Sequence, residues 1–134
     1  ELAIKESVEK RVHFLGYVSK EDKSRIIDSS LFLTVPSRQE AMSIVVLESG
    51  ICGKPVLITD QCGFNEVGEG MNGGLVVQPS LEGLASGITE MLDNRDRLDS
   101  MGENLKKNIK KRYLWSILAE EYDSLFNDIK LKQV

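Results

Sequence analysis

The sequence has 134 residues, of which 41% are hydrophobic and 28% charged, and this composition fits one globular domain with a core of ordinary size. Lysine and arginine number 17 against 21 aspartates and glutamates, so the formal net charge is -4, and no basic block matches a nucleic-acid footprint. A nucleic-acid partner is therefore disfavoured. With 2 cysteines and 1 histidine, the chain has too few soft ligands for a structural zinc site and fits a reducing compartment.

No apolar run approaches the roughly 20 residues that span a bilayer, and the N-terminal residues carry charges where a signal peptide needs an apolar core. We expect a cytoplasmic protein, and attachment to the cytoplasmic face of a membrane stays open. Because the chain lacks an initiator Met and opens on a helix-like stretch, we expect residues 1–134 to be one excised domain.

Short aliphatic or β-branched runs predict strands, and segments with helical spacing lie between or after most of them. The predicted strands are Val12–Leu15, Leu31–Val35, Pro55–Thr59 and Leu75–Val77. Continuous apolar strands are typical of a parallel sheet that is covered by helices on both faces. The alternation therefore predicts an α/β fold with a doubly wound parallel sheet.

The first helix after the first predicted strand has a recognisable start. Ser19 is followed three residues later by Asp22, which is an acidic variant of the capping pattern. The helix should end near Ser29 and bury Ile26 and Ile27.

The next helix should run from Ser43 to Cys52 and stop at Gly53, before Pro55. Its buried positions should be Ile44, Leu47 and Ile51. Two more apolar stripes have helical spacing: Leu81, Leu84, Ile88, Met91 and Leu92, and then Trp115, Leu118, Ala119, Tyr122, Leu125, Phe126 and Ile129. The last stripe persists for about four turns, so we expect its helix to pack across the whole domain as a clasp.

Polar residues gather where the second predicted strand ends, in the loop Pro36–Ser43. Open α/β sheets bind ligands at the carboxyl ends of their strands. The loop also leads into a helix whose first N–H groups have no intrahelical partner and can donate to a phosphate. A diphosphate at this helix start is therefore physically reasonable.

The same loop carries a spaced motif. Pro36-Ser37 is followed by Glu40, then by Glu48 after seven intervening residues, and then by Gly53-Lys54-Pro55-Val56. This pattern resembles the C-terminal domain of the retaining glycosyltransferases of GT-B fold that are called glycosyl transferases group 1. The resemblance covers nearly the whole chain, and it implies a Rossmann-like domain with C-terminal helices packed across its sheet.

The spacing of the two glutamates is not specific by itself, because Glu1/Glu9 and Glu82/Glu90 show the same interval. Those pairs lie in predicted surface helices. Glu40 and Glu48 instead flank a strand-to-helix loop between Pro-Ser and Gly-x-Pro-Val, and this context makes the resemblance specific.

The resemblance implies a role for each residue of the motif. Glu40 would be the catalytic residue that binds sugar hydroxyls and supports charge at the reacting carbon, and Glu48 would bind the ribose. The donor sugar and phosphates would be bound by Ala41, Met42, Ser43, Ile44 and Arg38, and the nucleobase would lie near Gly16 and Tyr17.

The chain departs from the family pattern after the first glutamate. The family has Gly-Phe-Gly where this chain has Ala41-Met42-Ser43, so two backbone-permissive positions carry a Cβ. We expect Ser43 to cap its helix rather than donate to phosphate. The diphosphate-binding Lys and Arg of the family are not identifiable, and we expect Lys20 and Lys23 to be ordinary surface charges.

The resemblance implies transfer of a sugar from a nucleotide diphosphate sugar to an acceptor, a glycan or lipid-linked glycan, with retained configuration and without metal or other cofactor. The acceptor would be bound mainly by an N-terminal domain that is absent here, and the fragment alone should be inactive. An epimerase-like domain of the same fold and a catalytically degenerate binding domain remain alternatives.

Overall fold

The structure is a computed structural model that describes residues 1–131. Its sheet has three parallel strands in the order β1 (Leu33–Val35), β2 (Val56–Thr59) and β3 (Gly74–Val77). The α/β class with a parallel sheet is therefore confirmed, as are three of the four predicted strands.

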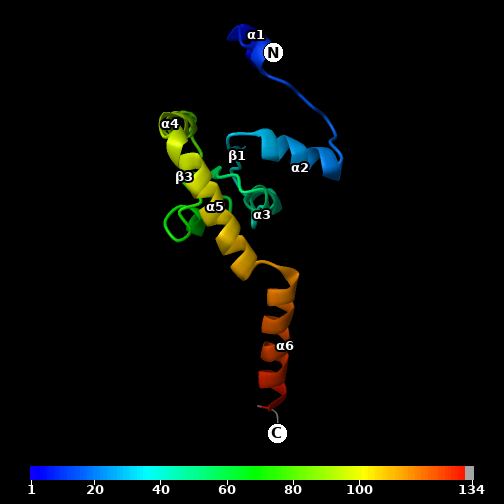
Figure 1. The fold of residues 1–134 in the computed structure, drawn as a ribbon. Helices are drawn as coiled ribbons and strands as arrows, with labels where there is room; N and C mark the ends of the chain where they lie inside the picture. Colours follow the sequence, from blue (N-terminus) through cyan, green and yellow to red (C-terminus); the bar gives the residue numbers. More distant parts are fainter. Residues whose placement is uncertain (132–134) are drawn as a thin grey trace.

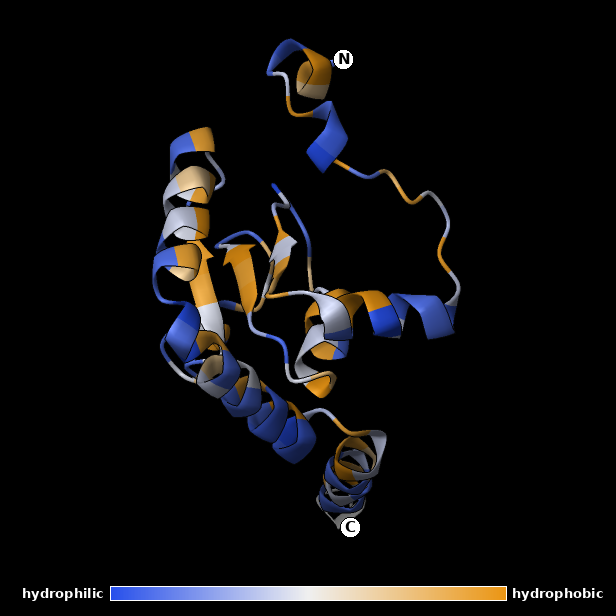
Figure 2. Ribbon diagram, turned by 45° about the horizontal axis from the view of Figure 1, so that its top comes forward, coloured by the Kyte–Doolittle hydropathy of each residue, from blue (hydrophilic) through white to orange (hydrophobic). Residues whose placement is uncertain are grey.

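The helices cover both faces of this sheet. Every residue of β2 is buried, and successive side chains of a strand point to opposite faces. Val56 and Ile58 belong to one core cluster with α3 (Ile44–Ile51) and α5 (Arg95–Arg112), whereas Leu57 faces α4 (Leu81–Asp93). Figure 2 shows the hydrophobic strands in the middle of the molecule, with the helices around them.

The long helix α5 was not predicted from the sequence. Most of its residues are polar, and the buried positions Leu98, Leu105 and Ile109 are separated by 7 and 4 residues within that polar background. This spacing fits one helical face. The helix contributes Leu105 and Ile109 to the main core. The sequence therefore carried a helical pattern here, although only a few apolar residues formed it.

The existence of α5 also explains why the predicted buried face of α3 was wrong at two of its three positions. Ile44 is 68% exposed and Ile51 41% exposed, whereas Val46 and Gly50 are buried. A side-chain carbon at Gly50 would lie 2.2 Å from the Ile109 side chain, so the two helices approach closely there. Gly50 of α3 therefore faces α5, and Leu47 packs half-buried against the core, whereas Ile44 and Ile51 are largely exposed.

Helix α2 (Lys20–Ser29) has the predicted bounds. Its cap is reciprocal, because the Ser19 hydroxyl accepts from the Asp22 N–H at 3.1 Å and donates to the Asp22 carboxylate at 2.9 Å. The prediction of two buried isoleucines is half right: Ile27 is buried, but Ile26 is 42% exposed.

The predicted strand Val12–Leu15 does not form. The chain begins with the short helix α1 (Leu2–Lys5) and the 3-10 helix η1 (Glu9–Arg11), and then runs as an extended segment to α2. Phe14 is 91% exposed on this segment. An extended segment becomes a strand only where its backbone pairs with a neighbour, and β1 has no partner on its outer edge within residues 1–131. Figure 1 shows the N-terminal part well separated from the sheet.

The last helix, α6 (Trp115–Leu131), does not pack across the domain as predicted. It follows α5 and extends away from the sheet (Figure 1). The apolar side chains of the predicted stripe are largely exposed: Trp115, Tyr122, Leu125, Phe126 and Ile129. Because α5 already covers this side of the sheet, it is α5 that provides the expected packing. Within residues 1–131, no helix combines the length and apolarity needed to cross a membrane.

The contact of α5 with the turn after α3 yields a test of this packing. A side-chain carbon at Gly102 would lie 1.9 Å from the backbone oxygen of Gly53. We expect Gly102→Ala to lower the free energy of unfolding by about 1–3 kcal/mol, even though alanine favours helices. Ser100→Ala, at an exposed position of the same helix, is the matched control in chemical denaturation. Equal stability of the two variants would contradict the contact.

Candidate functional site

Two loops meet at the carboxyl end of the sheet. The loop of residues 36–43 connects β1 to α3, and the loop of residues 60–64 follows β2 and leads to the 3-10 helix η2 (Asn65–Val67). Because β1 and β2 are parallel neighbours, both loops leave the sheet at the same edge.

Glu40 lies half-buried between these loops and is held at several points. The Ser37 hydroxyl donates to its carboxylate at 3.1 Å, and its own N–H donates to the backbone oxygen of Gln61 at 3.0 Å. The buried Thr59 hydroxyl in turn donates to the backbone oxygen of Ser37. The strand end thus fixes Ser37, and Ser37 orients the carboxylate of Glu40.

Gly63 lets the second loop lie directly against the first. Its φ is 64°, and a side-chain carbon there would sit 2.0 Å from the backbone oxygen of Ala41. Any other residue would be strained and would also collide with this backbone. The 60–64 loop therefore packs directly against the backbone of the 36–43 loop.

The start of α3 offers a row of free donors. Within the described residues, none of the backbone N–H groups of Ala41, Met42, Ser43, Ile44 and Val45 donates to a protein acceptor. Ala41, Met42 and Ile44 are exposed. N–H groups at a helix start, with the positive end of the helix dipole, favour a bound anion.

The expectation that Ser43 caps α3 was wrong. Ser43 occupies the N-cap position, but its side chain makes no capping hydrogen bond. Its Oγ is completely buried and has no partner among the described residues. A buried hydroxyl without a protein partner is unusual in a folded protein.

Glu48 lies on α3 and forms an ion pair with Lys23 of α2. The side chains of Lys23 and Glu48 are 40% and 34% exposed, respectively. Lys23 is therefore a partly exposed charge with an acidic partner, and no local pattern indicates this pairing across 25 residues of sequence. Arg38, by contrast, is exposed on the 36–43 loop.

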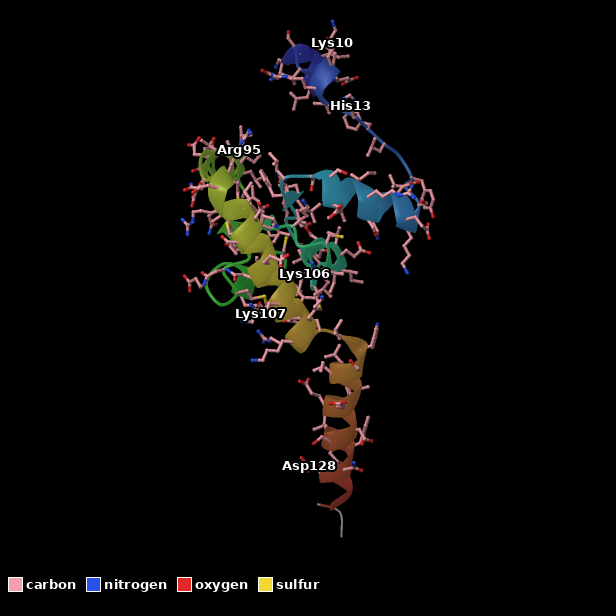
Figure 3. The ribbon with its side chains drawn as sticks, viewed as in Figure 1. Lys10, His13, Arg95, Lys106, Lys107 and Asp128 are labelled. Carbon is pink, nitrogen blue, oxygen red and sulfur yellow. The ribbon has the colours of Figure 1, made fainter. Side chains whose placement is uncertain are left out.

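The structure does not bring Gly16 and Tyr17 to this site. Tyr17 is 97% exposed, and a side-chain carbon at Gly16 would meet no atom within 4 Å. Figure 3 shows Lys10 and His13 on the same N-terminal segment, away from the sheet. The role of Gly16 and Tyr17 near a nucleobase stays a prediction.

The two cysteines do not supply a nucleophile. Burial, followed by the negative charge of Asp28, raises the pKa of Cys52, so its thiol stays protonated near neutral pH. Cys62 is buried and donates to the backbone oxygen of Val35 at 3.4 Å. Both are free, and no group of three or more metal-ligating side chains occurs within residues 1–131.

A separate cavity of about 790 Å³ lies at the outer edge of β3. Its lining includes Asp60, Asn72, Glu90 and Arg97, but no residue of the 36–43 loop. The cavity therefore lies on the β3 side of the 60–64 loop, to which Asp60 belongs, and is separate from the 36–43 loop that carries Glu40.

Two buried serines next to or within α3 allow a test of the orphaned hydroxyl. We expect Ser43→Ala to raise the free energy of unfolding by about 1 kcal/mol, because it removes a buried group that has no hydrogen-bond partner. Ser49→Ala is the matched control. The buried Ser49 hydroxyl donates to the backbone oxygen of Lys54 at 3.1 Å, so its loss should destabilise the protein. Thermal unfolding in phosphate-free buffer that shows the same sign for both variants would contradict this.

Comparisons with known proteins agree with the motif. The sequence model of the family described as glycosyl transferases group 1 matches residues 1–111. An uncharacterized glycosyltransferase of Methanocaldococcus jannaschii is 31% identical over 105 residues, which are 78% of this chain and 30% of that protein. D-inositol 3-phosphate glycosyltransferase of Corynebacterium glutamicum is 29% identical over 122 residues, 90% of this chain and 29% of that protein.

Solved structures show the same fold. Sucrose-phosphate synthase of Thermosynechococcus elongatus superposes with a TM-score of 0.85 at 23% identity, covering 98% of this chain and 33% of that one. Anabaena HepE, solved in complex with UDP and glucose, gives a TM-score of 0.78 at 21% identity and covers 93% and 34%. WaaG, a glycosyltransferase of lipopolysaccharide biosynthesis, is 30% identical with a TM-score of 0.75, covering 91% and 33%.

The chain thus spans about 30% of the length of the curated relatives it matches. With a family match over most of its residues and a shared fold, this chain belongs to the glycosyl transferases group 1 family.

Proposed function

We propose that this chain is the donor-binding domain of a retaining glycosyltransferase, which holds a nucleotide diphosphate sugar while the sugar passes to an acceptor. The observation that carries the proposal is the row of unpaired N–H groups from Ala41 to Val45, beside the orphaned Ser43 hydroxyl and the oriented carboxylate of Glu40. Donors at a helix start suit a diphosphate, and a fixed carboxylate suits sugar hydroxyls.

In this proposal the free N–H groups at the start of α3 bind the diphosphate of the donor. Arg38, exposed on the same loop, would add a cation close to the leaving diphosphate.

Glu40 would accept hydrogen bonds from the donor sugar and support the positive charge that develops at its anomeric carbon. The bond from that carbon to the diphosphate oxygen breaks, a bond to the acceptor oxygen forms on the same face of the sugar, and the proton of the acceptor hydroxyl passes to the leaving diphosphate. Glu48 would accept from the ribose hydroxyls in competition with the Lys23 ammonium group, which already contacts its carboxylate.

The proposed transfer requires no protein-bound metal, takes place in the cytoplasm, and uses an acceptor that the remainder of the enzyme binds. A glycan or lipid-linked glycan acceptor remains part of the proposal. The relatives named above are transferases, and no observation on residues 1–131 favours an epimerase-like or purely non-catalytic domain.

The two glutamates should respond differently to two ligands. We expect Glu48→Ala to weaken binding of both the free nucleotide diphosphate and the nucleotide sugar about tenfold or more, because the ribose is common to both. Glu40→Ala should weaken only the nucleotide sugar and should abolish transfer by the intact enzyme. Calorimetric titration with UDP, GDP, ADP and dTDP, each with and without a sugar, measures the changes in affinity for both ligands.

Glu82→Ala is the matched control, since Glu82 belongs to a pair with the same spacing but is exposed on α4. It should leave affinity and transfer unchanged. If the unmodified protein shows no saturable binding of any nucleotide, or if Glu40→Ala transfers sugar at the normal rate, the proposed function is wrong.

A further inference from the structure

The loop between β2 and η2 supports the backbone on which Glu40 stands. The N–H of Glu40 donates to Gln61 at 3.0 Å, and Gly63 lies against the backbone oxygen of Ala41. A displacement of this loop would therefore move the carboxylate of Glu40 and the neighbouring N–H groups together. Contacts that hold the 60–64 loop in place therefore also hold Glu40 and the neighbouring N–H groups in place.

The far end of the same loop is attached to the end of α5. The hydroxyl of Tyr113 donates to the Glu66 carboxylate at 2.8 Å, and its ring packs on the ring of Phe64 with centroids 5.3 Å apart. Phe64 is buried in the core, directly after Gly63. Tyr113 therefore holds the loop through both a polar and an apolar contact.

Tyr113 and Glu66 are themselves well anchored. Tyr113 is the C-cap of α5, and its N–H donates to the backbone oxygen of Ile109 at 2.8 Å. The backbone oxygen of Glu66 accepts from Gly70 at 3.1 Å and Met71 at 2.8 Å. The contact consequently joins two rigid elements, η2 and the end of α5, rather than two mobile side chains.

The protonation state suits a constant hydrogen bond. Burial, then the hydrogen bond and negative charge of Glu66, raise the pKa of Tyr113, while Arg112 opposes this. Tyr113 therefore keeps its proton at physiological pH and remains a donor to Glu66. Because this pKa is raised, the Tyr113 hydroxyl keeps its proton to a higher pH than an ordinary tyrosine does.

We propose that Tyr113 is a positioning residue for the donor site. Through Glu66 and Phe64 it holds η2 and the 60–64 loop against Ala41, and so it keeps Glu40 in place. The proposal rests on the proposed function for its effect on the donor. The coupling itself is a property of the loop and can be measured without any ligand. It also gives the junction of α5 and α6 a route to the site, because Tyr113 lies two residues before Trp115.

The test uses the full-length protein with Tyr113→Phe, which keeps the ring on Phe64 and removes the hydroxyl. Hydrogen exchange is followed in the peptide that spans residues 36–45, where the Glu40 N–H is the amide bonded to Gln61. We expect this amide to exchange about tenfold faster in the variant. The affinity for the nucleotide sugar should fall about threefold to tenfold, with the free diphosphate affected less.

Two further variants separate positioning from general destabilisation. Glu66→Gln keeps an acceptor oxygen for Tyr113, so its amide exchange and donor affinity should stay within about twofold of those of the original protein. Glu66→Ala should change both quantities as much as Tyr113→Phe does. Tyr122→Phe, at an exposed tyrosine of α6, should change neither quantity. In a double-mutant cycle, Tyr113→Phe and Glu66→Ala together should be no worse than either alone.

The two hypotheses fail in different ways. If Tyr113→Phe lowers the unfolding temperature but leaves exchange of residues 36–45 and donor affinity unchanged, Tyr113 is merely structural and the positioning role is overturned. If exchange accelerates as expected while the original protein binds no nucleotide sugar, the coupling stands and the proposed function fails.

Discussion

The contact on which the site depends is the approach of two backbones, at Gly63 and Ala41. A separation that leaves no space for a side chain is possible only because residue 63 is glycine with a left-handed φ. The parallel pairing of β1 and β2 brings the two loops to one edge, and this contact then fixes their distance. Packed backbones deform little, so the geometry around Glu40 is set before any ligand arrives.

Local sequence patterns were sufficient for the elements that build this edge. The aliphatic runs located β1, β2 and β3, and the Ser19–Asp22 pattern located the start of α2. The motif around Glu40 and Glu48 placed the site at a strand-to-helix loop for the same reason. Strand and helix starts are encoded within a few residues, and so they can be predicted from them.

What could not be predicted depends on partners distant in the chain. The face of α3 that is buried follows from its contact with α5, and the segment before α2 fails to form a strand because no neighbour within residues 1–131 pairs with it. The partner of Glu48 is 25 residues away, and the buried but unpaired hydroxyl of Ser43 is visible only in three dimensions. Helix α5 was partly predictable from local sequence, because its few apolar residues have helical spacing.

The ion pair between Lys23 and Glu48 has a consequence for how this protein would respond to its solution conditions. A ligand hydroxyl that approaches Glu48 competes with an ammonium group already in place, and a partly exposed pair of this kind is worth about 0–1 kcal/mol. Salt screens the pair, so it weakens as ionic strength rises. For a ribose, which carries no charge of its own, a more saline solution would then make the carboxylate easier to reach, in the opposite direction to its effect on the anionic diphosphate.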